Sequence, residues 1–428
     1  MPYVFDANTS VGKLSSIQMP VTNVSERGGC WPTQSQELLL KAALLQDQNA
    51  IDAWEKWKSN VDVRELDRGS LRLFPQLYRN LNIQGIKDSL LSTFKEAYRR
   101  TWRDNQLLFH HVSLLLASFQ SVGIETLVLK GAALALLHYK DAALRPMNDF
   151  DLMVRERQRS AAIGVMRDLG WMPIPRTPEG FTEGYLSVVN SHGFSHAAGR
   201  ECDLHWHLFP ECCQPDDDDD FWQQAVPFEI RGVLTRALAP ADQLLHVCVH
   251  GAEWNPIPPI RWIADAIMIM QSSSIDWDRV IAQGRQRRLM LPLKNTMDYL
   301  AIAFGAPVPS EVLETLHKAA ISKLEIAEYS YKIQNYEPKT LGFLPLLWFR
   351  YLRLENNKNS RLKLIGFVKY LQHFWGADSI WRLLVYAVLM VVRRTRIIAI
   401  GFAHRVSSLL PVKYTRASPD SKIMHRAQ

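Results

Sequence analysis

The sequence predicts an α+β protein, in which a small mixed sheet is flanked along the chain by helical N-terminal and C-terminal regions. Three observations support this fold class. Apolar residues recur at helical spacing over residues 86–121, and the pattern is helical again from about residue 238. Between these regions, over residues 123–208, short apolar runs alternate with helical patterns and end in two runs of alternating character.

The changes of pattern divide the chain of 428 residues into three expected domains, and this length can supply a core for each. They are an irregular N-terminus with a helical segment (1–122), a small mixed-sheet domain (123–237) and a helical domain with a basic, apolar tail (238–428). The first helix is expected after "TQSQ" (33–36), because Thr-x-x-Gln has the spacing of a capping box and "ELLLKAALL" follows it.

The middle region carries the strands. "IETLVLKG" (124–131) reads as a strand that ends at its glycine, and "AALALLHY" follows as a helix. "DFDLMV" (149–154) is the next strand, and the helix after it is closed by Gly170. Residues 192–207 read as two strands joined by a turn near Gly199. The unit is therefore strand, helix, strand, helix and hairpin.

Composition narrows the class of protein. The chain is 47% hydrophobic and 22% charged, which is typical of a soluble globular protein. It has a sparse, odd set of cysteines without a C-x-x-C pair, namely Cys30, Cys202, Cys212, Cys213 and Cys248. This argues against a disulfide framework and for a reducing, cytoplasmic compartment. We see no signal-peptide pattern at the N-terminus, and no apolar run reaches the roughly 18 residues that span a bilayer.

The charge is divided unevenly along the chain. Residues 341–428 hold 15 Lys and Arg against 3 Asp and Glu, whereas residues 1–340 carry a net charge of −5. A basic, apolar tail is typical of a helical domain with a solvated basic face, of peripheral contact with an anionic membrane, or of nucleic-acid binding. The first is favoured, and the acidic remainder argues against nucleic acid near the site. The run "DDDDD" (216–220) is expected to be a solvated loop.

Two aspartates stand one residue apart in "LRPMNDFDLMV". On a strand, Asp149 and Asp151 point to the same face, so their carboxylates lie side by side. Like charges that close shift each other's pKa unless a cation lies between them, and the pair therefore indicates a divalent metal site. The plainer interpretation is a strand end whose two acids face water.

Two further features can join this pair. In "LKG", Gly131 opens a helix, whose free N–H groups and partial positive charge suit a phosphate, and Lys130 adds a cation. Asp203 in "ECDLHWH" lies on another expected strand, which can place it beside Asp149 and Asp151 if the strands are neighbours. Three carboxylates around Mg²⁺ or Mn²⁺, with a phosphate cradle opposite, are what nucleotidyl transfer needs.

"LVLKGAALALLHYKDAALRPMNDFDLMV", followed by "DLHWHL", resembles the polymerase-β-type nucleotidyltransferase superfamily. It is most similar to the bacterial branch described as an uncharacterised nucleotidyltransferase family, which shows Leu-Lys-Gly, an Arg before Asp-x-Asp, and a later acid before Leu-His-Trp. The likeness covers about residues 124–272 well and the flanking helices loosely. It implies that Asp149 and Asp151 are metal ligands and that Asp203 is a third ligand and the base for the incoming hydroxyl.

The same resemblance implies that Gly131 forms the phosphate-binding turn. The wider superfamily has Gly or Ser after this glycine, whereas Ala132 follows it here, so the nucleotide contacts are less defined. Lys130 and Arg145 are interpreted as nucleotide-binding groups or as structural groups, and both interpretations stay open.

Other interpretations use the same residues. Asp-x-Asp also occurs in sugar-nucleotide glycosyltransferases, but the region upstream of it here reads as helix rather than as a large sheet. His246 and His250 have the i, i+4 spacing of a zinc pair on a helix, although packed structural histidines are favoured. A second cluster of potential zinc ligands matches no known zinc-binding spacing. It comprises His192, His196, His205, His207, Cys212 and Cys213. Asp265 is expected to cap a helix or to pair with Arg261.

The sequence thus predicts a metal-dependent nucleotidyltransferase that moves a nucleoside monophosphate from an NTP to an unidentified acceptor and releases pyrophosphate. The alternative is a nucleotide-binding or scaffold protein without turnover, tethered to a membrane surface or a partner by its C-terminal tail. Nucleic acid as the acceptor is open but not favoured, and peripheral contact with the inner membrane surface is a further expectation.

Overall fold

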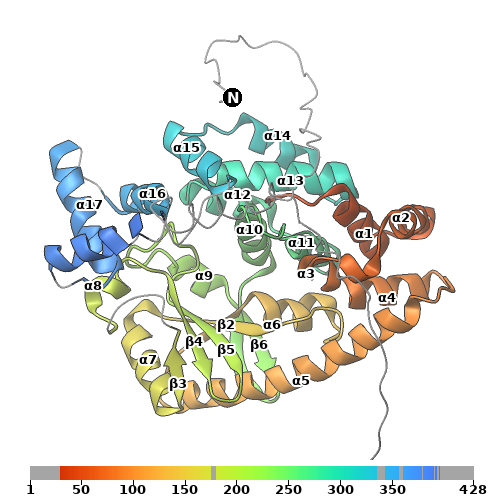
Figure 1. The fold of residues 1–428 in the computed structure, drawn as a ribbon, viewed down its shortest axis with the longest axis horizontal. Coiled ribbons are helices and arrows are strands. Elements are labelled where there is room, and N and C mark those ends of the chain that lie inside the picture. The colour runs from red at the N-terminus through yellow and green to blue at the C-terminus, as the bar shows by residue number, and fades with distance from the viewer. Residues whose placement is uncertain are drawn as a thin grey trace, which may run out of the picture.

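A seven-stranded mixed sheet forms the middle of the computed structural model (Figure 1). The structure describes residues 29–174, 180–334, 343–355, 360–377, 379–389, 391–392 and 395. The strands are β1 (Thr126–Leu129), β2 (Asp149–Val154), β3 (Trp171–Pro173), β4 (Ser191–His196), β5 (Arg200–His205), β6 (Val226–Ile230) and β7 (Val233–Ala237). They lie in the order β3-β4-β5-β2-β1-β7-β6, and helices flank the sheet on both sides along the chain. The α+β prediction is confirmed.

The sheet contains both parallel and antiparallel pairs of strands. β2 runs antiparallel to β1 and parallel to β5, while β1 and β7 are parallel. The expected hairpin is present as β4 and β5, and its turn contains Gly199 at φ 71°. The hairpin of β6 and β7 was not predicted, although its two-residue turn, Arg231–Gly232, has the positive φ values that such hairpins need.

The helices before and within the sheet follow the expected pattern closely. Before the sheet lie α1 (Gln34–Leu44), α2 (Asp47–Asn60), the 3-10 turn η1 (Val63–Glu65), α3 (Arg68–Leu71), α4 (Phe74–Ile83) and α5 (Leu91–Ser121). Between strands lie α6 (Lys130–Leu134), the π-helical turn η2 (Ala135–Tyr139), η3 (Glu156–Gln158), α7 (Arg159–Asp168), α8 (Glu183–Leu186) and α9 (Asp219–Gln224). The predicted capping box begins α1, because Thr33 and Gln36 each bond the other's backbone N–H.

Helices make up the described chain after the sheet. They are α10 (Pro240–Gly251), α11 (Arg261–Ser272), α12 (Trp277–Gln286), α13 (Met290–Phe304), α14 (Ser310–Lys318), α15 (Lys323–Lys332), α16 (Leu344–Leu354) and α17 (Ser360–Phe374). Residues 380–389 are helical as well. Within the described ranges, none of the helices is long and apolar enough to cross a bilayer.

Each face of the sheet packs into a different core. Val128, Phe150 and Leu152 contact α5 and α7, whereas the alternate residues Leu127 and Met153 belong to the core built around α10 and α11. This follows from the two-residue period of a strand, which sends neighbouring side chains to opposite faces. In Figure 1, α5 runs below the sheet, α7 lies to the left of it beside β3, and the helices from α10 onward lie above it. The predicted functional residues Asp149, Asp151 and Asp203 lie on the face that packs toward α10 and α11.

The N-terminal helices do not form a core of their own. Their buried side chains, such as Leu40, Trp54 and Phe74, belong to the same apolar cluster as residues of α10, α11 and α13. Trp31 lies 5.2 Å from Tyr299 between ring centroids, and the Tyr299 hydroxyl donates to Glu37 at 3.1 Å. Segments far apart in sequence therefore share one interior beside the sheet.

Candidate functional site

The pairing of β2 with β5 brings the predicted carboxylates together. The parallel register sets Asp151 opposite Asp203 and Asp149 opposite Glu201. Directly paired residues on neighbouring strands point to the same face, so Asp149, Asp151 and Asp203 share the face that looks toward α10. The sequence predicts that Asp203 lies beside Asp149 and Asp151 if their strands are neighbours. The structure shows that β2 and β5 are neighbours.

Asp151 is the buried member of the set. It is 7% exposed, and its Oδ1 accepts a bond from Lys130 Nζ at 2.8 Å and lies 3.3 Å from His205 Nε2. Burial alone raises the pKa of Asp151, but the charge of Lys130 and the hydrogen bond from His205 outweigh it and hold the pKa well below the usual range. Asp151 is therefore an anion at neutral pH, ready to hold a cation.

Asp149 and Asp203 differ from Asp151 in exposure. Asp149 begins β2 with an exposed side chain, and Asp203 is half-buried. Beside Asp203 on β4 lies Gly193, where a Cβ atom would come 3.0 Å from the Asp203 carboxylate. Glycine at this position therefore leaves room for the Asp203 side chain. The exposure of the three carboxylates therefore increases from the buried Asp151 through the half-buried Asp203 to the exposed Asp149.

Lys130 sits at the junction between β1 and α6 in a conformation that lysine rarely adopts. Its φ is +42°, in the left-handed region that costs a non-glycine residue about 1–2 kcal/mol. The cost is offset where the geometry is useful, and here it turns the ammonium onto Asp151. Gly131, the predicted phosphate turn, is buried, and a Cβ there would lie 2.8 Å from Met147 Sδ and 2.9 Å from Arg145 Nη1. Close packing by itself thus requires glycine at 131.

Arg145 is buried and paired inside the protein. Its guanidinium is 4% exposed and forms two bonds to Asp265, each 2.8 Å long, while the Tyr139 hydroxyl donates to the same carboxylate at 2.8 Å. Burial of Asp265 is outweighed by the charge of Arg145, which lowers the Asp265 pKa. Asp265 does form an ion pair, but its hydrogen-bonded partner is Arg145, whereas Arg261 donates to the Pro146 carbonyl at 2.9 Å. A nucleotide contact by Arg145 stays a prediction.

His205 is a site residue that sequence reasoning missed. Asp203 and His205 are two residues apart on β5 and therefore face the same side as Asp151. The same two-residue spacing that revealed Asp149 and Asp151 could have revealed His205. Among the described residues, Asp151, Asp203 and His205 form a group whose ligand atoms all lie within 4.8 Å of one another.

α10 places two imidazoles on the side facing these strands. Burial and the charge of Lys130 lower the pKa of His246, and the charge of Lys130 lowers the pKa of His250 to about 3. The rings of His246 and His250 lie 6.0 Å apart between centroids, and His250 is exposed. Both imidazoles are therefore neutral at pH 7 and can donate or accept hydrogen bonds, but they do not act as cations.

Other residues weighed for zinc have partners elsewhere. His207 Nδ1 lies 2.8 Å from Asp218, and His192 Nδ1 lies 2.9 Å from the Tyr185 hydroxyl. Asp218 is buried and also accepts from the backbone N–H of Leu208 at 3.1 Å. The interpretation of "DDDDD" as a solvated loop was wrong, because its last two residues begin α9 and Asp220 pairs with Arg287 at 2.8 Å.

The donor set fits a hard divalent cation. Carboxylate oxygens are the ligands that Mg²⁺ and Mn²⁺ prefer, and Asp151 with Asp203 supplies them side by side. His205 fits a supporting role better, since its Nδ1 is buried with no hydrogen-bond partner among the described residues. A metal-bound histidine normally donates its second N–H to a partner. His205 therefore fits as a donor to Asp151 through Nε2–H.

Comparison with known proteins adds a family. A family model described as an uncharacterised nucleotidyltransferase matches residues 70–305, which is more than half of the chain. The span includes Lys130, Asp149, Asp151, Asp203 and His205, whereas the wider polymerase-β-type superfamily and a bacterial source stay predictions. Comparison with curated proteins gives no match.

A solved structure, described as an antigenic nucleotidyltransferase-like protein from Paracoccidioides brasiliensis, is similar to this chain at 16% sequence identity and a TM-score of 0.34. The likeness covers 48% of this chain and 96% of that chain. At this TM-score it supports no conclusion about the site.

Proposed function

Because the chain belongs to the uncharacterised nucleotidyltransferase family, we propose that it moves a nucleoside monophosphate from an NTP to an acceptor hydroxyl or phosphate, with Mg²⁺ or Mn²⁺ and release of pyrophosphate. The observation that carries the proposal is the pairing of Asp151 with Asp203 on adjacent strands, with Asp149 two residues earlier, at the start of β2. A structural role alone gives no reason for this set, since like charges so close repel.

Asp149, Asp151 and Asp203 would hold the cation. When bound, a divalent cation polarises the α-phosphate and stabilises the leaving pyrophosphate. His205 keeps Asp151 oriented through its hydrogen bond, and Lys130 supplies positive charge that a triphosphate would share. The Lys130 side chain is 21% exposed, and its ammonium is paired with Asp151.

Asp203 is the group proposed to receive the acceptor proton. With a hydroxyl acceptor, its O–H proton passes to the Asp203 carboxylate while its oxygen bonds to the α-phosphorus. The bond from that phosphorus to the bridging oxygen breaks, and pyrophosphate leaves with the electron pair. Asp203 suits this role better than Asp151, since it is half-buried and open to an incoming substrate.

Pyrophosphate release tests this function. The purified chain is mixed with Mg²⁺ or Mn²⁺, each of the four NTPs in turn, and a small-molecule extract that offers acceptors. Asp149→Asn, Asp151→Asn and Asp203→Asn are each expected to lower the rate by about a hundredfold or more, the scale on which loss of one charge-stabilising group acts. Glu229→Gln is the matched control, because Glu229 is an exposed acid on β6 at the far edge of the same sheet.

The outcomes separate the enzyme from its alternative. Metal-dependent release that needs one NTP and all three aspartates supports nucleotidyl transfer. Metal-dependent NTP binding with no release from any extract favours the nucleotide-binding or scaffold protein. Release that persists in Asp151→Asn at the wild-type rate overturns the proposed site, because Asp151 is the buried anion around which the other groups are arranged.

A further inference from the structure

The last helices of the described chain present a large apolar surface, here called the end face. It consists of exposed residues of α17 and of the helix over 380–389, namely Leu364, Ile365, Val368, Ile380, Trp381, Leu384, Val385, Val388 and Leu389. Trp381 is 75% exposed and Ile365 is 68% exposed. Scattered apolar residues are normal on a protein surface, but a contiguous set of this size marks an interaction surface.

A groove joins the two parts of the end face. Its volume is about 750 Å³, and Ile365 and Val368 line it from α17 while Ile380 lines it from the next helix. Lys369 and His373 line it as well, and Gly184 of α8 lies on its other side. Apolar side chains of both helices, Ile365 and Val368 of α17 and Ile380 of the next helix, therefore border the same groove.

The end face is built on a packed base. Tyr370, Trp375 and Leu383 point inward into a small core with Tyr351 of α16, and each is less than 10% exposed. The helix over 380–389 is thus apolar on its packed side and on its outer side. A helix with large apolar residues on both its packed and its outer side needs a second apolar environment, because its packed side is already satisfied.

Charge indicates which environment this is. In the sequence, residues 360–389 hold four basic residues, Arg361, Lys363, Lys369 and Arg382, against one acidic residue, Asp378. Residues 1–340, by contrast, carry a net charge of −5. Basic side chains around exposed apolar ones, with a tryptophan among them, are what a protein presents to anionic lipid headgroups.

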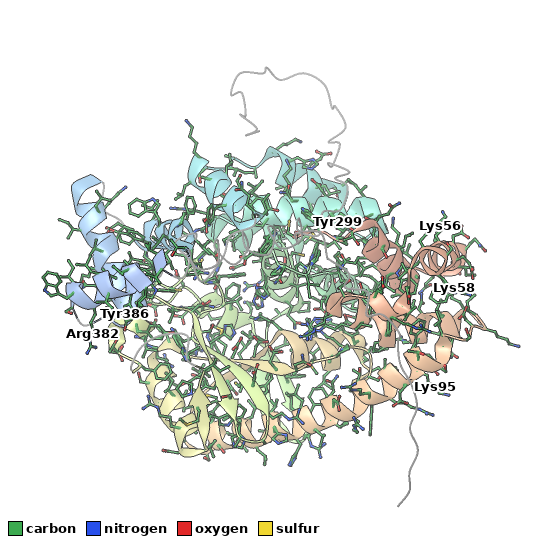
Figure 2. The ribbon with its side chains drawn as sticks, in the orientation of Figure 1. Lys56, Lys58, Lys95, Tyr299, Arg382 and Tyr386 are labelled. Carbon is green, nitrogen blue, oxygen red and sulfur yellow. The ribbon has the colours of Figure 1, made fainter. Side chains whose placement is uncertain are left out.

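We propose that the end face binds the surface of an anionic lipid bilayer without crossing it. A bilayer covers a protruding apolar end without a matching shape, and the groove can take part of an acyl chain. Figure 2 shows Arg382 and Tyr386 at one end of the molecule's longest axis, with Lys56, Lys58 and Lys95 at the other end. The chain would therefore be anchored by one end, with its N-terminal helices farthest from the lipid.

Co-sedimentation of the full chain with vesicles tests the proposal. Vesicles of phosphatidylcholine alone are compared with vesicles that also contain phosphatidylglycerol. The wild-type chain should sediment with the anionic vesicles and be released by high salt, because exposed charges are screened. Trp381→Ser combined with Leu384→Ser and Val388→Ser should weaken this binding by about tenfold or more, since three large apolar side chains no longer enter the interface.

Two controls test whether a loss of binding is specific to the end face and whether the variant is folded. Ile302→Ser removes an apolar side chain that is 85% exposed on α13, away from the end face, and should leave sedimentation unchanged. If the triple variant fails to fold by circular dichroism, Lys363→Glu with Lys369→Glu replaces it, and binding to the anionic vesicles should fall. Light scattering after gel filtration reports whether the chain is a monomer.

Four results would overturn the proposal. The first is no sedimentation with anionic vesicles, and the second is equal sedimentation with both kinds of vesicle. The third is a dimer that the triple variant dissociates, which would mean that a second copy covers the end face. Binding to anionic vesicles that the triple variant retains in full would also place the contact outside this surface.

Discussion

At the scale of single residues, one oxygen atom receives two donors. Oδ1 of Asp151 lies within hydrogen-bonding distance of both Lys130 Nζ and His205 Nε2. A divalent cation held by Asp151 would meet the ammonium of Lys130 there, and like charges repel. Lys130 is therefore a built-in counterion of Asp151, and its charge would compete with the metal in the absence of nucleotide and would assist the nucleotide once it is bound.

Lys130→Met tests this competition. Removal of the ammonium should tighten binding of Mn²⁺ to the nucleotide-free chain severalfold, because the cation no longer meets a positive charge. The same variant should weaken NTP binding, because a cation near the phosphates is lost. Electron paramagnetic resonance of free Mn²⁺ measures the first effect and equilibrium dialysis of labelled NTP the second.

Lys95→Met is the matched control, since it removes one positive charge from an exposed position on α5 (Figure 2). Its Mn²⁺ affinity should equal that of the wild type. Equal Mn²⁺ affinity of Lys130→Met and Lys95→Met would show that Lys130 does not compete for the metal.

The buried pair of Arg145 and Asp265 predicts a large effect on stability. Asp265→Asn leaves the guanidinium of Arg145 buried without its counterion, and breaking such a pair costs about 3–5 kcal/mol. Chemical denaturation followed by circular dichroism measures the free energy of unfolding. Asp168→Asn, which changes an exposed acid at the end of α7, is the control and should stay within about 0.5 kcal/mol of the wild type.

The same pair fixes the sign of a pH dependence. Because the folded-state pKa of Asp265 lies below its unfolded value of about 3.9, its contribution to stability is present above that pH and is lost as the pH falls through the folded pKa. The stability difference between wild type and Asp265→Asn should therefore be largest near pH 7 and shrink below about pH 4. A difference that grows toward acid would contradict this account.

At the scale of elements, the register of β2 against β5 creates the site. A shift of one residue would turn Asp203 toward α5 and would bury a carboxylate in the second apolar core. The register is held because Phe150, Leu152, Cys202 and Leu204 are all buried on that opposite face. Packing on one face of the sheet thus positions the charged groups on the other.

The crossing of α10 and α11 supplies an element-scale prediction. At Gly251, near the end of α10, an added Cβ would overlap the side chain of Trp262 on α11. Gly251→Ala should therefore destabilise the fold by about 1–3 kcal/mol through overpacking. Gly164→Ala in α7 is the matched control, because nothing lies within 4 Å of the added atom, and it should be neutral or stabilising by up to about 1 kcal/mol.

Thermal unfolding of the two glycine variants decides this prediction. Equal melting temperatures would mean that α10 and α11 can separate at no cost. In that case His246 and His250 would not be held rigidly over the strands.

At the scale of the whole molecule, the mixed-sheet domain predicted at 123–237 depends on its neighbours. One face of the sheet, with Leu127, Leu129 and Met153, is covered by helices outside that segment. Expressed alone, residues 123–237 should show no cooperative thermal transition and should bind a hydrophobic dye, because this apolar face meets water. The full chain measured in parallel is the control, and a cooperative melt of the segment would establish it as an independent domain.

The sequence by itself determined the features that follow from local periodicity. The two-residue period of a strand places Asp149 and Asp151 on one face, the spacing of Thr33 and Gln36 starts α1, and Gly199 turns the hairpin. The order of short motifs from Lys130 to His207 also predicts the family that the comparison finds. Each of these signals is read along the chain, from spacings or from the order of motifs, and needs no knowledge of which segments meet.

Only the tertiary structure decided which distant groups become partners. Arg145 pairs with Asp265, 120 residues away, and His205 contacts Asp151, 54 residues away. Within the acidic run, the buried Asp218 pairs with His207 and the half-buried Asp220 pairs with Arg287. The physical reason is that a buried charge must find a counterion, and the choice depends on which segments the apolar cores bring into contact, a property of the packed chain as a whole.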